Sequence, residues 1–323
     1  MATTSNGIKI IYGGGGLSSI LAAPEGYDSF HDYSKAILAI LEKEGISTLD
    51  TAEIYPGSEE EIAYNKATER FTVDTKLPGG FGESRTKDQI IAGGKGNLER
   101  LQTKQVHILY FHAPDTKVPF EEQLEASNEL YKAGAFKYLG LSNYTPAQVQ
   151  EVYDISKAKG YPLPKFYQGN YSAVGRKSES ELLPTLRKLG IAYNIYSPIA
   201  GGFLAKTRSQ VEAGAGRFNS THAVGQLYHG LYVKPTYLDA LDKWEVIAKD
   251  ADISKAELAY RWATYHSALK EGDGIIFGAK NEEQTKQTIA YIRAGPLDDK
   301  IAERVNELWK GVEAEAPIDN FHK

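Results

Sequence analysis

Eight short β-branched or aromatic segments alternate with amphipathic helical segments along the 323 residues, which predicts an α/β protein, a closed (β/α)8 TIM barrel. The alternation runs from end to end, and polar residues stand where nearly every predicted strand ends. We therefore expect residues 1–323 to form a single barrel domain, with a long loop after the seventh strand and a C-terminal tail.

The predicted strands span 8–12, 48–50, 72–76, 106–112, 137–142, 165–169, 191–196 and 274–278. From the second strand to the seventh, the distance between successive strand ends fits one βα unit. The step from the seventh strand to the eighth is far longer, so we expect an insertion at about residues 201–238. Loops of that length in a compact domain are usually functional.

The clearest predicted helix begins at Thr145, which can cap it, with Pro146 in the first turn and Gln148 completing a capping box. Gly160 is expected to end it. A second helix is predicted over residues 87–101, although it contains three glycines that each cost about 1 kcal/mol relative to alanine. The three tryptophans lie on helical segments and are expected to pack against the barrel: Trp244, Trp262 and Trp309.

The composition is that of an ordinary folded domain, with 41% hydrophobic and 24% charged residues. The formal net charge is −5 and no basic stripe accompanies the aromatic residues, which argues against a nucleic-acid partner. The sequence has no cysteine, which excludes disulfides, thiolate nucleophiles and zinc sites with sulfur ligands. No segment near the N-terminus has the pattern of a signal peptide or membrane span, so we expect a cytoplasmic protein.

Asp50 and Tyr55 lie at one predicted strand end and on the loop that follows it, and Lys76 ends the next strand. We expect these three side chains to meet at the mouth of the barrel. A tyrosine with a pKa near 10 is a weak acid, so we expect the Lys76 ammonium to lower the pKa of Tyr55, and Asp50 to orient Lys76. His112, at the fourth strand end, can bind a carbonyl oxygen. These groups polarise and protonate a carbonyl but supply no electrons, so a hydride donor must bind the same face.

Four blocks in this order resemble the aldo-keto reductase family along essentially the whole chain: Leu49-Asp50-Thr51-Ala52-Glu53-Ile54-Tyr55, Asp74-Thr75-Lys76, Leu109-Tyr110-Phe111-His112-Ala113-Pro114-Asp115 and Gly140-Leu141-Ser142-Asn143-Tyr144. Four more resemble its aflatoxin aldehyde reductase branch: Tyr167-Gln168-Gly169-Asn170-Tyr171, Pro198-Ile199-Ala200-Gly201-Gly202, Gly216-Arg217-Phe218 and Tyr260-Arg261-Trp262. The resemblance implies that Tyr55 donates a proton, that Lys76 and Asp50 tune it, and that His112 orients the carbonyl.

The resemblance also implies NADPH as cofactor, with NADH less favoured, extended across the barrel mouth. It implies that Ser142, Asn143 and Gln168 bind the carboxamide and that Tyr196 stacks on the nicotinamide ring. The other implied contacts lie near the first, seventh and eighth strand ends: Gly13, Gly14, Ser197, Ile199, Gly201, Lys206, Arg217, Gly278, Lys280, Gln284 and Gln287. Because the sequence lacks the Lys-Ser-x5-Arg pattern of many relatives, Lys280 or Arg217 would supply the cation for the adenosine 2′-phosphate, beside a helix N-terminus predicted at Asn281.

Each residue also has a structural interpretation. Asp50 and Lys76 could be turn residues, Asn143 and Gln168 could satisfy loop backbone, and Tyr196 could pack at the rim. Arg217 and Lys280 could be solvated surface charges, and the run Gly13–Gly16 could be a flexible loop without ligand contact. His107 and His112 are an odd number of residues apart on one predicted strand and should face opposite sides, which argues against a metal site.

The sequence therefore predicts an NADPH-dependent reductase of a small aldehyde or ketone, with a catalytic tetrad of Asp50, Tyr55, Lys76 and His112 and without metal, nucleic-acid or membrane partners. An alternative is a cofactor-sensing regulatory subunit with little or no turnover, since relatives of this fold serve as channel accessory proteins. A metal-assisted barrel hydrolase is a third hypothesis, which the scattered histidines disfavour. Either a monomer or a homodimer fits the sequence.

Overall fold

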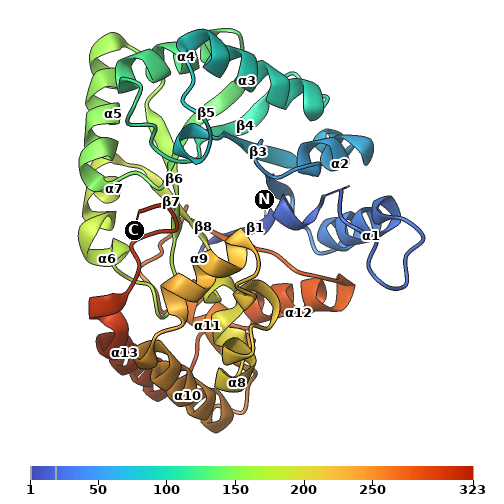
Figure 1. The fold of residues 1–323 in the computed structure, drawn as a ribbon, viewed down its shortest axis with the longest axis vertical. Coiled ribbons are helices and arrows are strands. Elements are labelled where there is room, and N and C mark those ends of the chain that lie inside the picture. Colours follow the sequence, from blue (N-terminus) through green and yellow to red (C-terminus); the bar gives the residue numbers. More distant parts are fainter. Residues whose placement is uncertain (1, 19, 323) are drawn as a thin grey trace.

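In the computed structural model, which describes residues 2–18 and 20–322, the strands close into a barrel in the order β1 to β8, each parallel to its neighbours (Figure 1). The strands are β1 Lys9–Gly13, β2 Thr48–Asp50, β3 Thr72–Leu77, β4 Val106–Phe111, β5 Phe136–Ser142, β6 Pro164–Asn170, β7 Ala192–Tyr196 and β8 Gly274–Phe277. No strand end differs from its predicted position by more than one residue, so the predicted barrel is confirmed.

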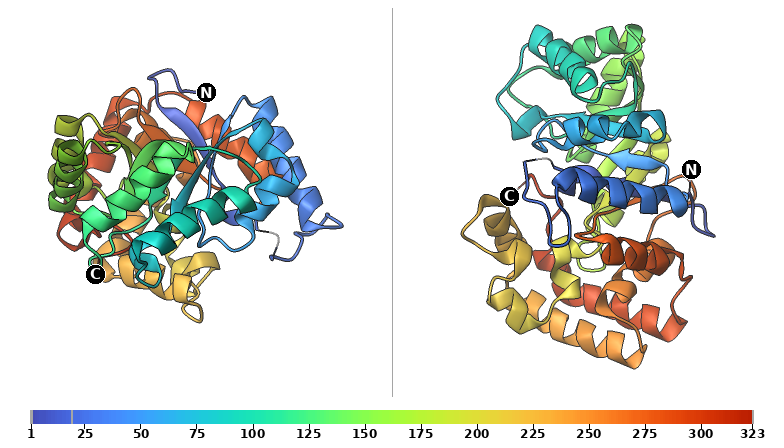
Figure 2. Two further views of the ribbon diagram at one scale, coloured as in Figure 1. Left: turned by 90° about the horizontal axis from the view of Figure 1, so that it is seen from above. Right: turned by 90° about the vertical axis from the view of Figure 1, so that its right-hand side faces the viewer.

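Helices surround the barrel on all sides (Figure 2). They are α1 Phe30–Lys43, α2 Ser58–Tyr64, α3 Lys87–Arg100, α4 Phe120–Lys132, α5 Pro146–Lys159, α6 Ser178–Glu181, α7 Leu183–Leu189, α8 Arg208–Glu212, α9 Ala223–Tyr232, α10 Pro235–Asp250, α11 Lys255–Tyr265, α12 Glu282–Arg293 and α13 Asp299–Val312. Short 3-10 turns lie at η1 Gly14–Gly16, η2 Ala67–Glu69, η3 Gly79–Phe81, η4 Ala200–Ala205, η5 Gly216–Phe218 and η6 Glu313–Glu315. Within the described part of the chain, no helix is both long and apolar enough to cross a membrane.

The helix signals predicted for α5 are present, and α3 begins with a capping box that was not identified from the sequence. Thr145 accepts a hydrogen bond from the backbone of Gln148 and its own backbone N–H donates to the Gln148 side chain, and Gly160 ends α5 at a φ of 67°. Thr86 and Gln89 form the same reciprocal capping box at the start of α3. This box satisfies backbone N–H groups of the first turn, which helps α3 to form in spite of its glycines.

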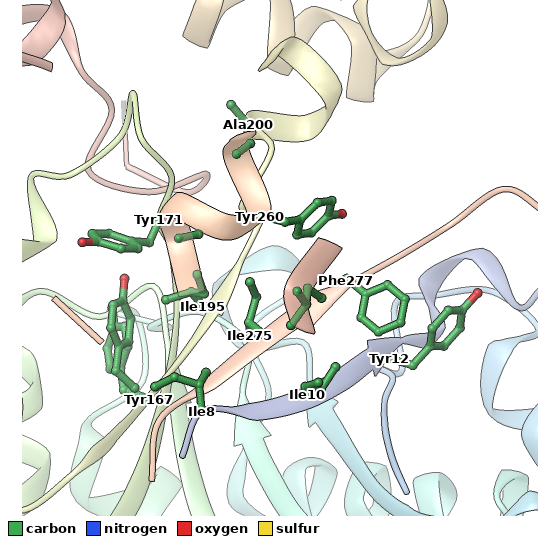
Figure 3. Packing of buried hydrophobic residues seen from close by; sticks show 14 of the residues in the cluster. Ile8, Ile10, Tyr12, Tyr167, Tyr171, Ile195, Ala200, Tyr260, Ile275 and Phe277 are labelled. Carbon is green, nitrogen blue, oxygen red and sulfur yellow. The ribbon is translucent and has the colours of Figure 1, made fainter. Parts of the chain in front are cut away.

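Two apolar clusters hold the barrel together. The larger one lies between the strands and the helices, where aliphatic residues of β1, β7 and β8 pack beside Tyr260 of α11 (Figure 3). The smaller one contains Ile108, Tyr110 and Phe166, whose alternate positions along β4 and β6 point into the barrel. Trp244, Trp262 and Trp309 are buried, as predicted. The interior cluster forms an apolar support for the polar residues at the mouth.

The long segment expected after the seventh strand, at about residues 201–238, is present and is largely built of short helices. It contains η4, α8, η5, α9 and the start of α10. Thr207 and Gln210 form a capping box for α8, and the Phe203 ring stacks on Tyr232 with ring centres 5.6 Å apart. Tyr228 and Tyr232, four residues apart, share one face of α9, which is the spacing of a helix.

Candidate active site

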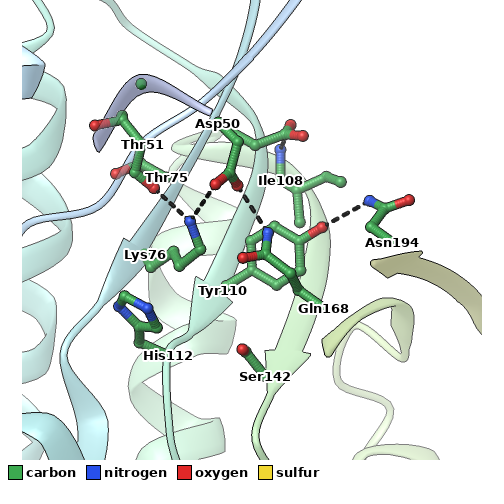
Figure 4. A network of polar contacts seen from close by, with 12 residues as sticks. Asp50, Thr51, Thr75, Lys76, Ile108, Tyr110, His112, Ser142, Gln168 and Asn194 are labelled. Carbon is green, nitrogen blue, oxygen red and sulfur yellow. Dashed lines mark hydrogen bonds and ion pairs between the residues drawn. The ribbon is translucent and has the colours of Figure 1, made fainter. Parts of the chain in front are cut away.

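The four predicted catalytic residues converge at the carboxyl ends of β2, β3 and β4. The Lys76 Nζ atom donates hydrogen bonds of 2.7 Å to Asp50 Oδ2 and to the Thr51 carbonyl oxygen (Figure 4). It lies 5.3 Å from the centre of the Tyr55 ring, and the His112 ring meets Tyr55 edge to face at 5.7 Å. The strand ends therefore bring together a phenol, an ammonium, a carboxylate and an imidazole.

The Lys76 ammonium is completely buried. Burial alone would lower its pKa, but the charges of Asp50 and Tyr55 and the hydrogen bond to Asp50 outweigh burial and raise the pKa of Lys76. The second Asp50 oxygen accepts a 2.8 Å hydrogen bond from Gln168 Nε2. Both carboxylate oxygens are thus held, and Lys76 remains a cation directed at the mouth of the barrel.

The pKa of Tyr55 is raised, not lowered as the sequence suggested. Burial of the phenol raises it, and the nearby Lys76 ammonium lowers it only in part. The expectation failed because it weighed the charge of Lys76 without the burial of the ring, which a sequence does not reveal. The phenol consequently stays protonated in neutral solution, which is the form a proton donor needs.

His112 is a neutral imidazole in this environment. Burial lowers the pKa of His112 well below 6.5, and the Lys76 charge lowers it further. Its ring lies between Tyr55 and Phe81, edge to face with the Phe81 ring at 5.0 Å. A neutral imidazole carries one N–H group, which suits it to hydrogen-bond a carbonyl oxygen without competing with Tyr55 as the acid.

A layer of polar residues below the tetrad was not identified from the sequence. Asn194 Nδ2 donates to the Tyr110 hydroxyl at 3.0 Å (Figure 4). Asp74 Oδ1 accepts from the Ile108 backbone at 3.1 Å. His107 Nδ1 lies 2.9 Å from the same Asp74 oxygen. Asp74 stands two residues before Lys76 on β3, so the alternation of strand side chains was the available signal. Among residues 2–18 and 20–322 no group of three or more His, Asp or Glu is arranged to hold a metal ion.

Asn143 connects the end of β5 to the neighbouring strand ends. It has a φ of 60°, and its Nδ2 donates to the His112 carbonyl oxygen at 2.8 Å and to Ser142 Oγ at 3.1 Å. Its Oδ1 accepts a 2.8 Å hydrogen bond from the Tyr196 hydroxyl. These contacts bring together four predicted cofactor residues beside the tetrad: Ser142, Asn143, Gln168 and Tyr196. Asn143 also satisfies loop backbone through the His112 carbonyl oxygen, as its structural interpretation required.

Three cations from separate segments converge outside the rim. The Nζ atoms of Lys206 and Lys280 both lie within 4 Å of the point that a Cβ would occupy on Gly216. Arg217 is the next residue, and its guanidinium lies over the Tyr228 ring at 5.8 Å. We call Lys206, Arg217 and Lys280 the cation cluster. Within the described residues, none of the three side chains has an ion-pair partner.

The cation cluster is electrostatically unfavourable unless an anion joins it. Partial burial lowers the pKa of Lys206, and repulsion from Lys280 and Arg217 lowers it further. Lys280 and Arg217 are exposed, as expected of surface charges. Isolated surface charges would not gather around Lys206 as these two do. Like charges brought together in this way are typical of a site for phosphate groups.

A cavity of about 580 Å³ opens next to the cation cluster, between η4, α10, α11 and α12. Three predicted cofactor residues line it, Ile199, Gln284 and Gln287, together with Tyr260 and Tyr291. Asn281 caps α12 by accepting from the Gln284 backbone at 2.8 Å, as predicted. The size and mostly uncharged lining of the cavity suit a nucleoside.

The remaining predicted residues lie at the ends of β1 and β8 and in the turn after β7. Gly14 begins the turn η1, where Ser58 Oγ donates to its carbonyl oxygen, and a Cβ on Gly15 would lie 3.5 Å from the Tyr55 ring. Gly13 faces Gly278 across the closing strands β1 and β8. Ser197 and Gly201, both at positive φ, form the turn after β7.

The sequence is similar to that of a known family of proteins along most of its length. The profile of the Aldo/keto reductase family matches residues 9–310. The oxidoreductase sirO of Leptosphaeria maculans is 34% identical over 290 residues, which cover 88% of each chain. The aflatoxin B1 aldehyde reductase member 2 proteins of Rattus norvegicus and Homo sapiens are 34% and 33% identical over 87% of this chain, and over 81% and 83% of their own lengths. The matched range contains the tetrad, the cation cluster and the cavity.

Proposed function

The chain belongs to the aldo/keto reductase family, and from this premise we propose that it reduces an aldehyde or ketone with NADPH, using Tyr55 as the proton donor. Family membership makes the protein an NAD(P)H-dependent carbonyl-reducing enzyme. The observation that carries the finer proposal is the convergence of Tyr55, Lys76, Asp50 and His112 within one set of contacts.

Each side chain has one task in this proposal. The bound nicotinamide supplies the hydride that the carbonyl carbon receives. His112 donates its N–H to the carbonyl oxygen, and Tyr55 transfers its hydroxyl proton to that oxygen as the alcohol forms. Lys76 stabilises the phenolate that remains, and Asp50 keeps Lys76 charged and oriented. Solvent then returns a proton to Tyr55.

The residues outside the tetrad fit a dinucleotide. The cation cluster offers unpaired positive charge for phosphate groups, and the adjoining cavity is large enough for a nucleoside. Ser142, Asn143, Gln168 and Tyr196 would hold the nicotinamide end beside Tyr55. Lys280, next to the Asn281 cap of α12, supports a preference for the 2′-phosphate of NADPH over NADH.

Replacing Tyr55 with phenylalanine tests the proposed acid. Tyr55→Phe removes the transferable proton and leaves the ring, so we expect kcat for aldehyde reduction to fall by about a thousandfold or more. The Kd for NADPH, measured by quenching of tryptophan fluorescence, should change less than about twofold. Tyr64→Phe, which removes a hydroxyl from an exposed tyrosine at the end of α2, is the matched control and should retain full activity.

The substrate panel should contain aromatic, aliphatic, sugar and dicarbonyl compounds, with NADH as the paired cofactor. Oxidation of NADPH by the wild type and its loss in Tyr55→Phe would support the proposal. Full activity in Tyr55→Phe would contradict the role of Tyr55. Tight NADPH binding without turnover on any member of the panel would favour the regulatory subunit instead.

A further inference from the structure

Two buried carboxylates lie on neighbouring strands inside the barrel, and the proposed mechanism uses only one of them. Asp50 and Asp74 are direct partners in the register of β2 and β3, so their side chains leave the sheet on the same face. Asp50 is 4% exposed and Asp74 is 1% exposed. Like charges this close repel each other, and burial strengthens the repulsion. Each carboxylate therefore needs a partner of its own.

The two carboxylates have different partners. Asp50 accepts a 2.7 Å hydrogen bond from the Lys76 ammonium (Figure 4). Asp74 Oδ1 accepts from the Ile108 backbone at 3.1 Å and lies 2.9 Å from His107 Nδ1. An imidazole protonated at Nδ1 donates its N–H to this oxygen. His107 is therefore the side chain that compensates the negative charge of Asp74, as Lys76 compensates that of Asp50.

The charge of Asp74 depends on His107 because the carboxylate is buried. Burial raises the pKa of Asp74, and the hydrogen bond and charge of His107 lower it only in part. The neighbouring Asp50 raises this pKa further, and the Lys76 ammonium lowers it. Without the hydrogen bond from His107, Asp74 would therefore take up a proton at a higher pH.

Asp74 also lies close to the cation that acts on Tyr55. Asp74 and Lys76 are two residues apart on β3 and so share one face of the strand. Lys76 is in register with Tyr110, and its Nζ atom lies 5.8 Å from the centre of the Tyr110 ring. Burial raises the pKa of Tyr110, and the charges of Asp74 and then Asp50 raise it further. A negative charge on Asp74 thus acts on the groups directly below the tetrad.

His107 lies at the opposite end of the barrel from the tetrad. It is the second residue of β4, whereas His112 follows the carboxyl end of that strand, and its side chain is 15% exposed. Its ring meets the Tyr138 ring edge to face at 5.2 Å and lies 5.9 Å from the Phe166 ring. A further charged group at this end is Lys9 of β1, whose Nζ atom lies 5.0 Å from the centre of the Phe166 ring. Aromatic contacts therefore hold His107 in place while part of it stays open to solvent.

We propose that Asp74 and His107 are positioning residues for the reduction: His107 keeps Asp74 ionised, and ionised Asp74 offsets part of the positive charge that Lys76 directs at Tyr55. The inference rests on the proposed function and adds two residues to it. The hydrogen bond to Asp50 keeps Lys76 charged without help from Asp74. The negative charge of Asp74 instead limits the stabilisation of the phenolate, so Tyr55 holds its proton to a higher pH.

Asp74→Asn tests the charge of Asp74. Asparagine keeps the shape of the side chain and an acceptor for the Ile108 backbone, but it carries no charge, so Tyr55 should lose its proton more readily. We expect the pH at which kcat for aldehyde reduction falls to half to move down by about one unit, and the rate of alcohol oxidation at about pH 7 to rise about tenfold. A loss of kcat that is equal at every pH, with an unshifted midpoint, would show a merely structural role and overturn the inference.

Two substitutions separate the hydrogen bond of His107 from its ring. His107→Phe keeps a ring beside Tyr138 and Phe166 but donates nothing, so Asp74 should be protonated at neutral pH and ionise only in the alkaline range. Alcohol oxidation at about pH 7 should then rise as in Asp74→Asn, whereas the rate at about pH 10 should match the wild type. His107→Asn places an amide N–H near the position of Nδ1 and should keep the wild-type profile.

The double variant and a neighbouring ring provide the controls. Asp74→Asn combined with His107→Phe should oxidise alcohol at about pH 7 no faster than Asp74→Asn alone, because His107 acts only through Asp74. Tyr138→Phe removes a hydroxyl from the ring beside His107 and should keep the wild-type profile. Additive effects in the double variant, or a wild-type oxidation rate in His107→Phe, would overturn the inference.

NMR titration of Tyr55 provides a readout that needs no turnover. In protein whose tyrosines carry carbon-13 at Cζ, the signal that is missing from Tyr55→Phe identifies Tyr55. This signal should begin to shift about one pH unit lower in Asp74→Asn than in the wild type, and equal titrations would overturn the inference. If the wild type reduces no aldehyde, the proposed function fails, and the titration still decides whether the charge of Asp74 acts on Tyr55.

Discussion

Tyr55 is subject to two opposed electrostatic influences. Burial raises the pKa of its phenol, and the Lys76 ammonium, 5.3 Å from the ring centre, lowers it in part. The first effect keeps the proton on Tyr55 in neutral solution, and the second stabilises the phenolate that forms when the proton leaves. A buried phenol beside a buried cation therefore keeps its proton before the transfer and is stabilised as a phenolate after it.

The raised pKa of Tyr55 and the lowered pKa of His112 predict the pH dependence of the reaction. Reduction needs protonated Tyr55, whose pKa is above 10, and neutral His112, whose pKa is below 6.5, so kcat should be flat between about pH 6.5 and 9. Oxidation of the alcohol needs the phenolate, so its rate should rise with pH, by up to about tenfold per unit, across the alkaline range. Steady-state rates in both directions measure this. A reduction rate that falls between about pH 7 and 8 would show that the pKa of Tyr55 is lowered after all.

At the scale of elements, the segment after β7 depends on a turn that only glycine fits. Gly201 has a φ of 67°, and a Cβ there would lie 2.0 Å from Tyr228 Cε1 of α9. Gly201→Ala must displace either the turn or the Tyr228 ring, and a shift of this ring would disturb the Arg217 guanidinium that lies over it. We expect the Kd for NADPH to rise about tenfold and the free energy of unfolding to fall by about 1–3 kcal/mol.

Gly230→Ala is the matched control for this substitution. Gly230 lies near the end of α9, and no atom lies within 4 Å of the point that a Cβ would occupy there. Alanine should therefore stabilise the protein by up to about 1 kcal/mol and leave NADPH affinity unchanged. Fluorescence titration and urea denaturation measure the two quantities. Equal NADPH affinity in Gly201→Ala and the wild type would show that the turn does not position the cation cluster.

The elements differ in how far the sequence could predict them. Strand positions and the capping box of α5 are local, so β-branched runs and one Thr-x-x-Gln spacing were sufficient, and the same spacing at Thr86 was an available signal for α3. Asp50 and Lys76 could be paired because they end adjacent strands. The family resemblance named Lys206, Arg217 and Lys280 as cofactor contacts, but residue spacing could not predict their convergence, since Lys206 and Lys280 meet only after the barrel closes. The contact of Phe321 with Phe81 could not be predicted either. Burial of Tyr55 is likewise a property of the folded chain.

At the scale of the whole molecule, the charge distribution opposes the overall charge. The chain carries a net charge of −5, which repels an anionic cofactor at long range, whereas the cation cluster attracts it at the entrance of the cavity. Attraction by a local cluster of partly exposed charges is screened by salt. NADPH binding should therefore depend on ionic strength more steeply than NADH binding, because NADPH carries the additional 2′-phosphate.

Lys280→Met tests whether this difference arises at the start of α12. Removing one cation near the predicted 2′-phosphate should raise the Kd for NADPH about tenfold and the Kd for NADH less than about twofold, and it should reduce the loss of NADPH affinity between about 50 and 500 mM NaCl. Lys243→Met, an exposed lysine on α10, is the control for the change in net charge. Equal weakening of both cofactors would place Lys280 at the diphosphate that they share. In that case the discrimination between NADPH and NADH would have to come from another group, and Arg217 and the α12 N-terminus are the next candidates to test.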